Sequence, residues 1–420
     1  MADCIEFVKD FSAELRQNSG RLSGSEDETA CARQIRNRLH DETDAKTRME
    51  AFWARPTMGR RTFTLIGLWS ILCYVLYYVS FAGNRLVGTL LTLVALIAFV
   101  VGNGILISLY LGVPTFQRLL KKRVSYNVVS EYGADDSRNV FVVCDHHDSM
   151  PGSIIRDFDF VRKFCTVAVP ICALIFVLFC ILKMAFGTQD GDVAAKISAF
   201  TIVPAAVGII SNTACLLHFS SNSKNARENN GISTSVAMAT YAYFVDKPEL
   251  LPEDVKIVYA SFGAENSAHC GSRAFVEAHP EFANATVLCI EDVQSSVFNV
   301  VDYDALRKVE CDSNVVAAIL TSAREQDMTV PIMQHESLSG VFKCLHGFMS
   351  NAFCKDGVSG AGIIAKSHGS AKDIEEEDVE KLFSLCVGTM QILMKNAKHT
   401  EIKDDVAEQT GIQIVDVVGK

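Results

Sequence analysis

The chain has 420 residues, 49% of them hydrophobic, and a formal net charge of −10 at pH 7. Its mean hydropathy of +0.20 is high for a water-soluble protein, so membrane segments are considered first. The acidic balance and the absence of a dense Lys/Arg tract exclude a nucleic-acid-binding domain. The 14 cysteines form no CxxC pair, which indicates reduced thiols rather than a disulfide framework.

The N-terminal region is polar and amphipathic, which is not the pattern of a signal peptide. A loop at Gly20–Gly24 precedes the stretch EDETACARQIRNRLH, which predicts an amphipathic helix packed on a sheet. Four apolar stretches without charged residues follow, at 62–84, 86–117, 164–182 and 197–217. Each reaches the roughly 18–20 residues that cross a hydrocarbon core, so we predict four transmembrane helices. Buried core helices are the alternative, chiefly for the second pair, which Pro170 and Pro204 interrupt.

The four stretches pair into two helical hairpins, with short turns at Gly83–Arg85 and Gly187–Asp192. Two hairpins return the chain to its starting side, so all of the remaining polar sequence lies on one side of the bilayer. An excess of Lys and Arg next to the membrane marks the cytoplasmic side, and the polar flanks carry that excess. We therefore predict an integral membrane protein whose polar domain faces the cytoplasm. The basic flanking residues are Arg55, Arg60, Arg61, Arg118, Lys121, Lys122, Arg123, Arg156, Arg162, Lys163, Lys224 and Arg227.

With the hairpins set aside, short apolar runs alternate with helical patterns. The sequence predicts strands at 140–144, 256–262, 286–290 and 362–365, and helices at 232–244, 271–278, 313–326, 335–348 and 375–397. This alternation is typical of an α/β domain with a mostly parallel central sheet flanked by helices.

Polar clusters follow the predicted strands. They are Asp145–Asp148, Phe262–Asn266, Glu291–Asp292 and Lys366–His368, and a fifth, Arg227–Asn230, opens the helix at 232. Open α/β sheets place their ligand sites at the carboxyl ends of strands. Imidazoles and carboxylates that converge there suit a Zn²⁺ site. Taken singly, each cluster also fits a loop of solvated polar groups.

Taken in order, these clusters resemble the motifs of the co-catalytic zinc aminopeptidases, a family that includes glutamate carboxypeptidase and transferrin receptor. The family has His-x-Asp-Ser after a strand, an Asp-Asn helix start, Phe-Gly-Ala-Glu-Glu with a following Gly-Ser, a strand ending in Asp, and a late His. The corresponding segments here are His146–Ser149, Ala226–Asn229, Phe262–Asn266, Gly271–Ser272, Ile290–Glu291, and His368 with Asp373. The segment RLSGSEDETACARQIRNRL is similar to the family's N-terminal part.

The resemblance implies a zinc-exopeptidase-like domain, interrupted by inserted membrane hairpins. Its parts are 1–61, 118–163, which carries the first metal motif, and 219–420, which carries the other site residues. The hairpins are 62–117 and 164–218.

The same resemblance implies the roles of the site residues. His146 is a zinc ligand and Asp148 its partner, which holds the imidazole through the other ring nitrogen. Glu265 is the general base for a metal-activated water. The remaining ligands for one or two Zn²⁺ ions are Glu228, Glu291 (or Asp292 in a shifted register) and His368.

Three positions depart from the family pattern. Asn266 replaces a usual acidic ligand with a neutral amide, and Glu replaces Asp at Glu228 and Glu291. The first hypothesis is a membrane-anchored zinc aminopeptidase that hydrolyses short peptides. The alternative is a catalytically inactive binding or scaffold protein with the same fold. A transport role is disfavoured, because the membrane segments carry almost no charge. The oligomeric state is left open.

Overall fold

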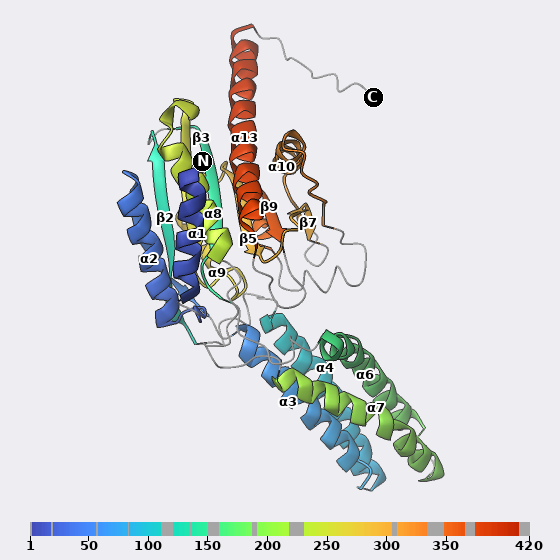
Figure 1. Cartoon of the computed structure of the whole chain (residues 1–420). Helices are drawn as coiled ribbons and strands as arrows, with labels where there is room; N and C mark the ends of the chain where they lie inside the picture. Colours follow the sequence, from blue (N-terminus) through green and yellow to red (C-terminus); the bar gives the residue numbers. More distant parts are fainter. Residues whose placement is uncertain are drawn as a thin grey trace.

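The computed structural model describes residues 2–17, 20–55, 58–82, 84–110, 121–134, 137–149, 159–186, 191–217, 231–304, 309–333, 348–365 and 374–410. Two parts are evident in Figure 1: an α/β domain, and a bundle of four long helices that extends from one edge of its sheet. The bundle consists of α3, α4, α6 and α7, and we refer to it as the helical bundle. No disulfide joins any of the described cysteines.

The α/β domain is built on a seven-stranded sheet in the order β1-β2-β4-β3-β5-β9-β6. Its four central strands are parallel, whereas β1, β2 and β6 join by antiparallel pairing. The sheet is therefore mixed, and the expectation of a mostly parallel sheet holds only for its centre. The strands are β1 (Lys46–Ala54), β2 (Arg123–Gly133), β3 (Asn139–His146), β4 (Val255–Phe262), β5 (Thr286–Val293), β6 (Asn299–Val301) and β9 (Ser359–Ala365), with a separate hairpin of β7 (Tyr303–Asp304) and β8 (Val309–Glu310).

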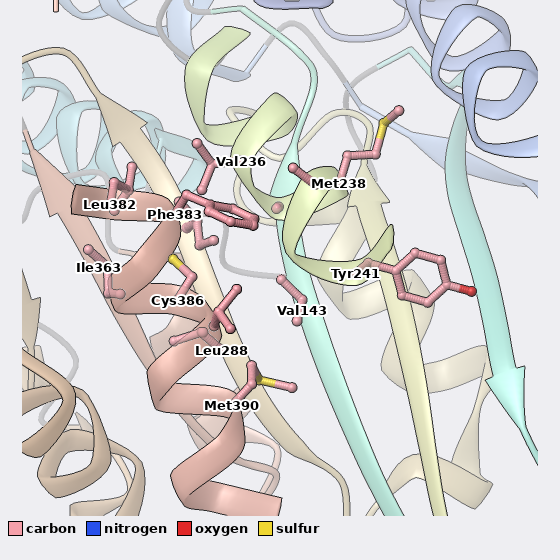
Figure 2. Close-up of a cluster of buried hydrophobic side chains, with 14 of the residues drawn as sticks. Val143, Val236, Met238, Tyr241, Leu288, Ile363, Leu382, Phe383, Cys386 and Met390 are labelled. Carbon is pink, nitrogen blue, oxygen red and sulfur yellow. The ribbon is translucent and has the colours of Figure 1, made fainter. Parts of the chain in front are cut away.

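One face of the sheet is covered by α8, α2, α10 and α13, with α1 packed outside α8. Figure 2 shows Val143, Leu288 and Ile363 of three neighbouring strands facing Phe383 and Met390 of α13. All five side chains are fully buried. The helices are α1 (Ala2–Gln17), α2 (Glu26–Glu42), α8 (Gly231–Val245), α10 (Ser313–Glu325) and α13 (Glu376–Thr410), with a 3₁₀ turn, η2, at Pro248–Leu250.

The opposite face is covered by two short helices, α9 (Cys270–Ala278) and α12 (Met349–Lys355), with the 3₁₀ turn η3 at Pro280–Phe282. Phe262 at the end of β4 packs between Phe275 of α9 and Phe353 of α12, with ring centroids 5.4 Å and 5.7 Å away. Aromatic pairs at these separations stabilise a core beyond the area they bury. This packing holds α9 against the end of β4.

The helical bundle consists of α3 (Met58–Val79), α4 (Arg85–Tyr110), α6 (Asp159–Ala185) and α7 (Gly191–Leu217). Tyr74, Phe99 and Phe176 meet at its centre, and the Tyr74 hydroxyl donates to the Cys172 carbonyl over 3.1 Å. Among the described residues, the stretches Arg85–Ser108 and Val167–Ala185 are long and apolar enough to cross a bilayer. The described apolar parts of α3 and α7 are shorter, so four membrane spans remain a prediction.

The predicted strands and most predicted helices lie within a few residues of the observed ones. The helix expected at 335–348 falls almost entirely outside the described residues. The antiparallel pair β1 and β2 was not predicted. Lys46, Arg48 and Glu50 place charges along β1, which is an edge strand with one side open, so its sequence lacks the apolar run of a central strand.

Candidate functional site

Three of the predicted polar clusters lie at one end of the sheet, along the border formed by the carboxyl ends of the central strands β3, β4 and β5. We call this the site edge. The parallel register pairs His146 with Phe262 and Cys144 with Cys289, so the residues that follow these strands emerge side by side. The side chains of His146, Asp148, Glu265, Glu291 and Asp292 are all buried there. Burial of five ionisable side chains requires hydrogen-bonded or charged partners.

His146 and Asp148 form the first such pair. Nδ1 of His146 lies 3.0 Å from Oδ1 of Asp148. The second oxygen of Asp148 accepts hydrogen bonds from the Ser23 hydroxyl at 2.6 Å and from the Asn266 backbone N–H at 3.0 Å. Burial lowers the pKa of His146, but the hydrogen bond and charge of Asp148, with the charges of Asp292 and Glu291, outweigh it and raise the pKa to about 9.

Asn266, which stands where the family pattern has an acidic ligand, points its amide toward Asp148. Its Nδ2 donates to the Asp148 carboxylate over 3.1 Å and to the Asp148 carbonyl over 3.2 Å. An amide nitrogen is a donor and cannot bind a metal. In this arrangement Asn266 ties the loop after β4 to the loop after β3.

Glu265 is held at the N-terminus of α9. Its Oε1 lies 2.6 Å from Nδ1 of His269 and accepts the Ser272 hydroxyl over 2.8 Å, while its Oε2 accepts the Ser272 backbone N–H over 2.9 Å. The start of a helix favours a negative charge, so this carboxylate has a charge-stabilising environment. The Gly271–Ser272 segment belongs to the resemblance found in the sequence, but that resemblance assigned no role to Ser272.

Glu291 and Asp292 lie at the end of β5, where the pairing with β9 is interrupted between Glu291 and Val293. The extra residue of this bulge, Asp292, has φ +52°, in the left-handed region that non-glycine residues rarely adopt. Glu291 accepts the backbone N–H of Met349 at the start of α12 over 3.0 Å. Of the two carboxylates, Asp292 has the larger effect on the pKa of His146.

Left-handed backbone conformations gather at this edge. Of the five described non-glycine residues with positive φ, four lie at the site edge: Ala264, Ala268, His269 and Asp292. Such conformations cost free energy and persist where the surrounding structure enforces them, often at functional sites.

Glu28 of α2 is a site residue that sequence reasoning did not single out. Its carboxylate accepts the backbone N–H groups of Gly24 and Ala264, each over 2.6 Å, and so joins the N-terminal segment to the loop after β4. Burial and the charge of Asp148 raise the pKa of Glu28 above its ordinary value, although the two backbone N–H donors oppose this shift. The sequence feature that could have indicated Glu28 is its position in the segment that resembles the family's N-terminal part.

His147 faces away from Asp148, into the core beneath the site edge. Its Nδ1 lies 3.0 Å from the Ser261 hydroxyl, which donates to Asp145 over 2.7 Å. The Ser261 oxygen therefore accepts from Nδ1–H of His147. Burial lowers the pKa of His147 to about 3, so the ring is neutral at physiological pH.

Two of the predicted ligands, Glu228 and His368, lie outside the described residues. Among the residues that the structure describes, no group of three His, Cys, Asp or Glu side chains has the arrangement of a metal site. What those residues do provide is a histidine held by a carboxylate, with the carboxylates of Asp292 and Glu291 near enough to raise its pKa. This donor chemistry fits one part of a zinc site.

Comparisons with known proteins give structural neighbours only. No family model matches the chain, and no curated protein matches it. The aminopeptidase from Aneurinibacillus sp. strain AM-1 has a TM-score of 0.47 at 11% identity, covering 92% of this chain and 93% of the other. A zinc aminopeptidase from Bacillus subtilis has a TM-score of 0.46 at 12% identity, with coverages of 92% and 93%. A glutaminyl cyclase from Fimbriiglobus ruber has a TM-score of 0.46 at 11% identity, with coverages of 92% and 95%.

Proposed function

We propose that the chain is a membrane-anchored zinc metallopeptidase, most simply an aminopeptidase that hydrolyses short peptides. The observation that carries this proposal is the buried pair of His146 and Asp148 at the end of β3. A histidine that ligates zinc usually donates its other ring N–H to a carboxylate, which fixes the tautomer and the ring orientation. Asp148 is itself held by Ser23 and Asn266, so the ring position is well defined.

In this proposal the metal-holding residues are His146, Glu228, His368 and a carboxylate at the end of β5, for one or two Zn²⁺ ions. Asp292 is favoured over Glu291 as that carboxylate for two reasons. Asp292 is the bulged residue that is left out of the pairing between β5 and β9, and Glu291 already accepts the Met349 backbone N–H. Bound zinc would polarise the scissile carbonyl and lower the pKa of water.

Glu265 is the proposed general base. Its hydrogen bonds from His269 and Ser272 hold both carboxylate oxygens in place, and a positioned carboxylate can take a proton from water and deliver it to the leaving amine. Asp148 acts through His146 and is a positioning residue.

We further propose that all four helices of the helical bundle cross a membrane, with the α/β domain on the cytoplasmic side. The support is the outer surface of the bundle, where large apolar side chains are exposed on every helix. A continuous apolar surface of this kind is unfavourable in water and ordinary in lipid. Examples are Leu72 and Leu68 of α3, Leu86 and Ile97 of α4, Leu174 and Val167 of α6, and Phe200 and Val203 of α7. The domain divisions at 1–61, 62–117, 118–163, 164–218 and 219–420 belong to this proposal.

The test is metal analysis of the purified full-length protein together with a peptide hydrolysis assay. We expect zinc in at least equimolar amount, hydrolysis abolished by Glu265→Gln, and zinc retained by that variant. His146→Ala should lose zinc. A folded protein without zinc and without hydrolysis would refute the enzyme proposal.

The second candidate is a catalytically inactive binding or scaffold protein. The specific observation in its favour is Asn266, which places a donor amide against Asp148 at a position where the family pattern has an acidic ligand. The same metal analysis decides between the two candidates.

A further inference from the structure

Both hairpins of the helical bundle join the α/β domain at the site edge. β1 runs parallel to β4, because two successive antiparallel pairings separate them, so its end at Ala54 lies at the same edge as the end of β4. α3 begins at Met58, so its start lies within about 15 Å of Ala54. The second hairpin leaves the domain after β3, the strand that carries His146. Figure 1 shows the bundle extending from this edge.

Direct contacts connect the hairpin ends to the loops of the site. The backbone of Arg55, three residues before α3, lies next to the sulfur of Cys270 at the start of α9, the helix that holds Glu265. At the other end of the same hairpin, Arg123 donates to the carbonyl of Gly24 over 3.4 Å. Gly24 in turn donates its N–H to Glu28.

Ser149, the last described residue before the second hairpin, is also bound to the N-terminal segment. The backbone N–H of Ser149 donates to the carbonyl of Arg21 over 2.7 Å, and Leu22 pairs with Ser149 as an isolated bridge. The described residues nearest to the hairpins are thus bound to the same loops that hold Asp148 and Glu265, and the bundle extends from this edge (Figure 1).

Trp53 lies at this edge, in β1 and two positions before Arg55. Its side chain is 66% exposed, although tryptophan is usually buried in a water-soluble domain. Tryptophan is enriched at the membrane–water interface, where its ring is apolar and its N–H remains hydrated. An exposed Trp53 beside the start of α3 therefore fits a site edge at the level of the lipid headgroups.

From this geometry we propose that the substrates are polypeptides anchored in the same bilayer by a transmembrane segment, whose free N-terminal residues lie close to the membrane surface. The inference rests on the proposed peptidase function and specifies its substrate class. A site that faces the bilayer is open to chains that emerge from it and is screened from large soluble proteins. Anchoring also raises the effective concentration of substrate at the site.

The orientation can be tested without any activity. The chain has two tryptophans, Trp53 and Trp69, so the Trp69→Phe variant reports Trp53 alone. In phosphatidylcholine vesicles with a minor fraction of phosphatidylglycerol, we expect lipids carrying a shallow spin label to quench Trp53. Trp53→Phe reports Trp69 within α3 as the positive control, which a deep label should quench. Adding Glu253→Trp to the variant that lacks both tryptophans places the probe at the opposite edge, before β4, where neither label should quench. Trp53 left unquenched by both labels would overturn the inference.

The substrate class is tested with one peptide sequence in two forms, soluble or fused to an apolar transmembrane segment, with N-terminal residue release followed by mass spectrometry. For the anchored form in the same vesicles as the enzyme we expect kcat/KM higher by roughly 10²-fold, the gain that a second binding interaction provides. The gain should vanish when enzyme and peptide occupy separate vesicles. Equal rates for both forms would overturn the substrate class and leave the peptidase function intact. No hydrolysis of either form would overturn the peptidase function itself, and the substrate class with it.

Discussion

Nδ1 of His269 lies 2.6 Å from Oε1 of Glu265, and both side chains are buried at the start of α9. His269 has a left-handed backbone conformation here, with φ +56°. The imidazole therefore holds the carboxylate that we propose as the general base, and it does so at a conformational cost.

His269→Gln should lower kcat while leaving KM and zinc content nearly unchanged. Partners that orient a reacting group typically contribute 10–100-fold, and we expect a loss in that range. The measurement is steady-state peptide hydrolysis with parallel metal analysis. Ser272→Ala is the matched control, because it removes one hydroxyl donor to Glu265 and leaves the backbone donor in place. Full activity in His269→Gln would show that this pair is structural only.

Asp148→Ala should weaken zinc binding by roughly 10–100-fold, because the imidazole of His146 loses the carboxylate that fixes its tautomer. Asp148→Asn keeps the shape of the side chain and an acceptor oxygen, so a smaller loss is expected. Competition with a chelating dye measures both affinities in the intact protein. Equal zinc affinity in the wild type and in Asp148→Ala would contradict the proposed role of the pair.

The sequence predicts the centre of the sheet because its information is local there. β3, β4 and β5 are buried along almost their whole length, so each reads as a short apolar run with polar residues at its end. The side chains that complete the site come from elsewhere. Glu28 binds the backbone of Ala264, which is 236 residues away along the chain, and no local pattern indicates such a contact.

Backbone geometry is the second kind of information that the sequence does not display. The choice between Glu291 and Asp292 depends on the bulge in β5. Both alternatives are consistent with the residue order, which does not reveal that Asp292 is the bulged residue.

Gly271→Ala should destabilise the α/β domain by about 1–3 kcal/mol, the usual cost of overpacking. A Cβ at this position would lie 2.3 Å from the Gly263 carbonyl and 2.8 Å from Cβ of Phe262, so α9 and the loop after β4 must separate. Thermal unfolding in detergent measures this change in stability. Gly104→Ala in α4 is the control, since nothing lies within 4 Å of its Cβ. An unchanged melting temperature for Gly271→Ala would contradict this close approach of α9 to the loop after β4.

The ion pair between Glu50 of β1 and His279 after α9 should make stability depend on pH. Nε2 of His279 lies 2.9 Å from Oε2 of Glu50. Burial alone lowers the pKa of His279, but Glu50 and Glu281 outweigh it and raise the pKa above its ordinary 6.5. Burial raises the pKa of Glu50, but His279 and Arg48 outweigh it and hold the pKa below its ordinary 4.5.

The sign of the effect follows from these directions. The contribution of His279 is complete below pH 6.5 and is lost as pH rises through its raised pKa. That of Glu50 is complete above pH 4.5 and is lost as pH falls through its lowered pKa. His279→Gln should therefore lower the free energy of unfolding by up to about 1 kcal/mol between pH 4.5 and pH 6.5, and by less at alkaline pH. A difference from wild type that does not change with pH would contradict the pair's contribution.

The membrane topology predicts that the two turns of the helical bundle lie on the side opposite the α/β domain. Short protease sites inserted between Asn84 and Arg85, and within 187–190, should be cut in intact cells by protease added outside. The same site inserted at 135–136, between β2 and β3, should be cut only after the membrane is permeabilised. The physical reason is that two apolar hairpins carry their turns across the hydrocarbon core and return the chain to its starting side. Cleavage at all three positions only after permeabilisation would favour the alternative in which these helices form a buried core.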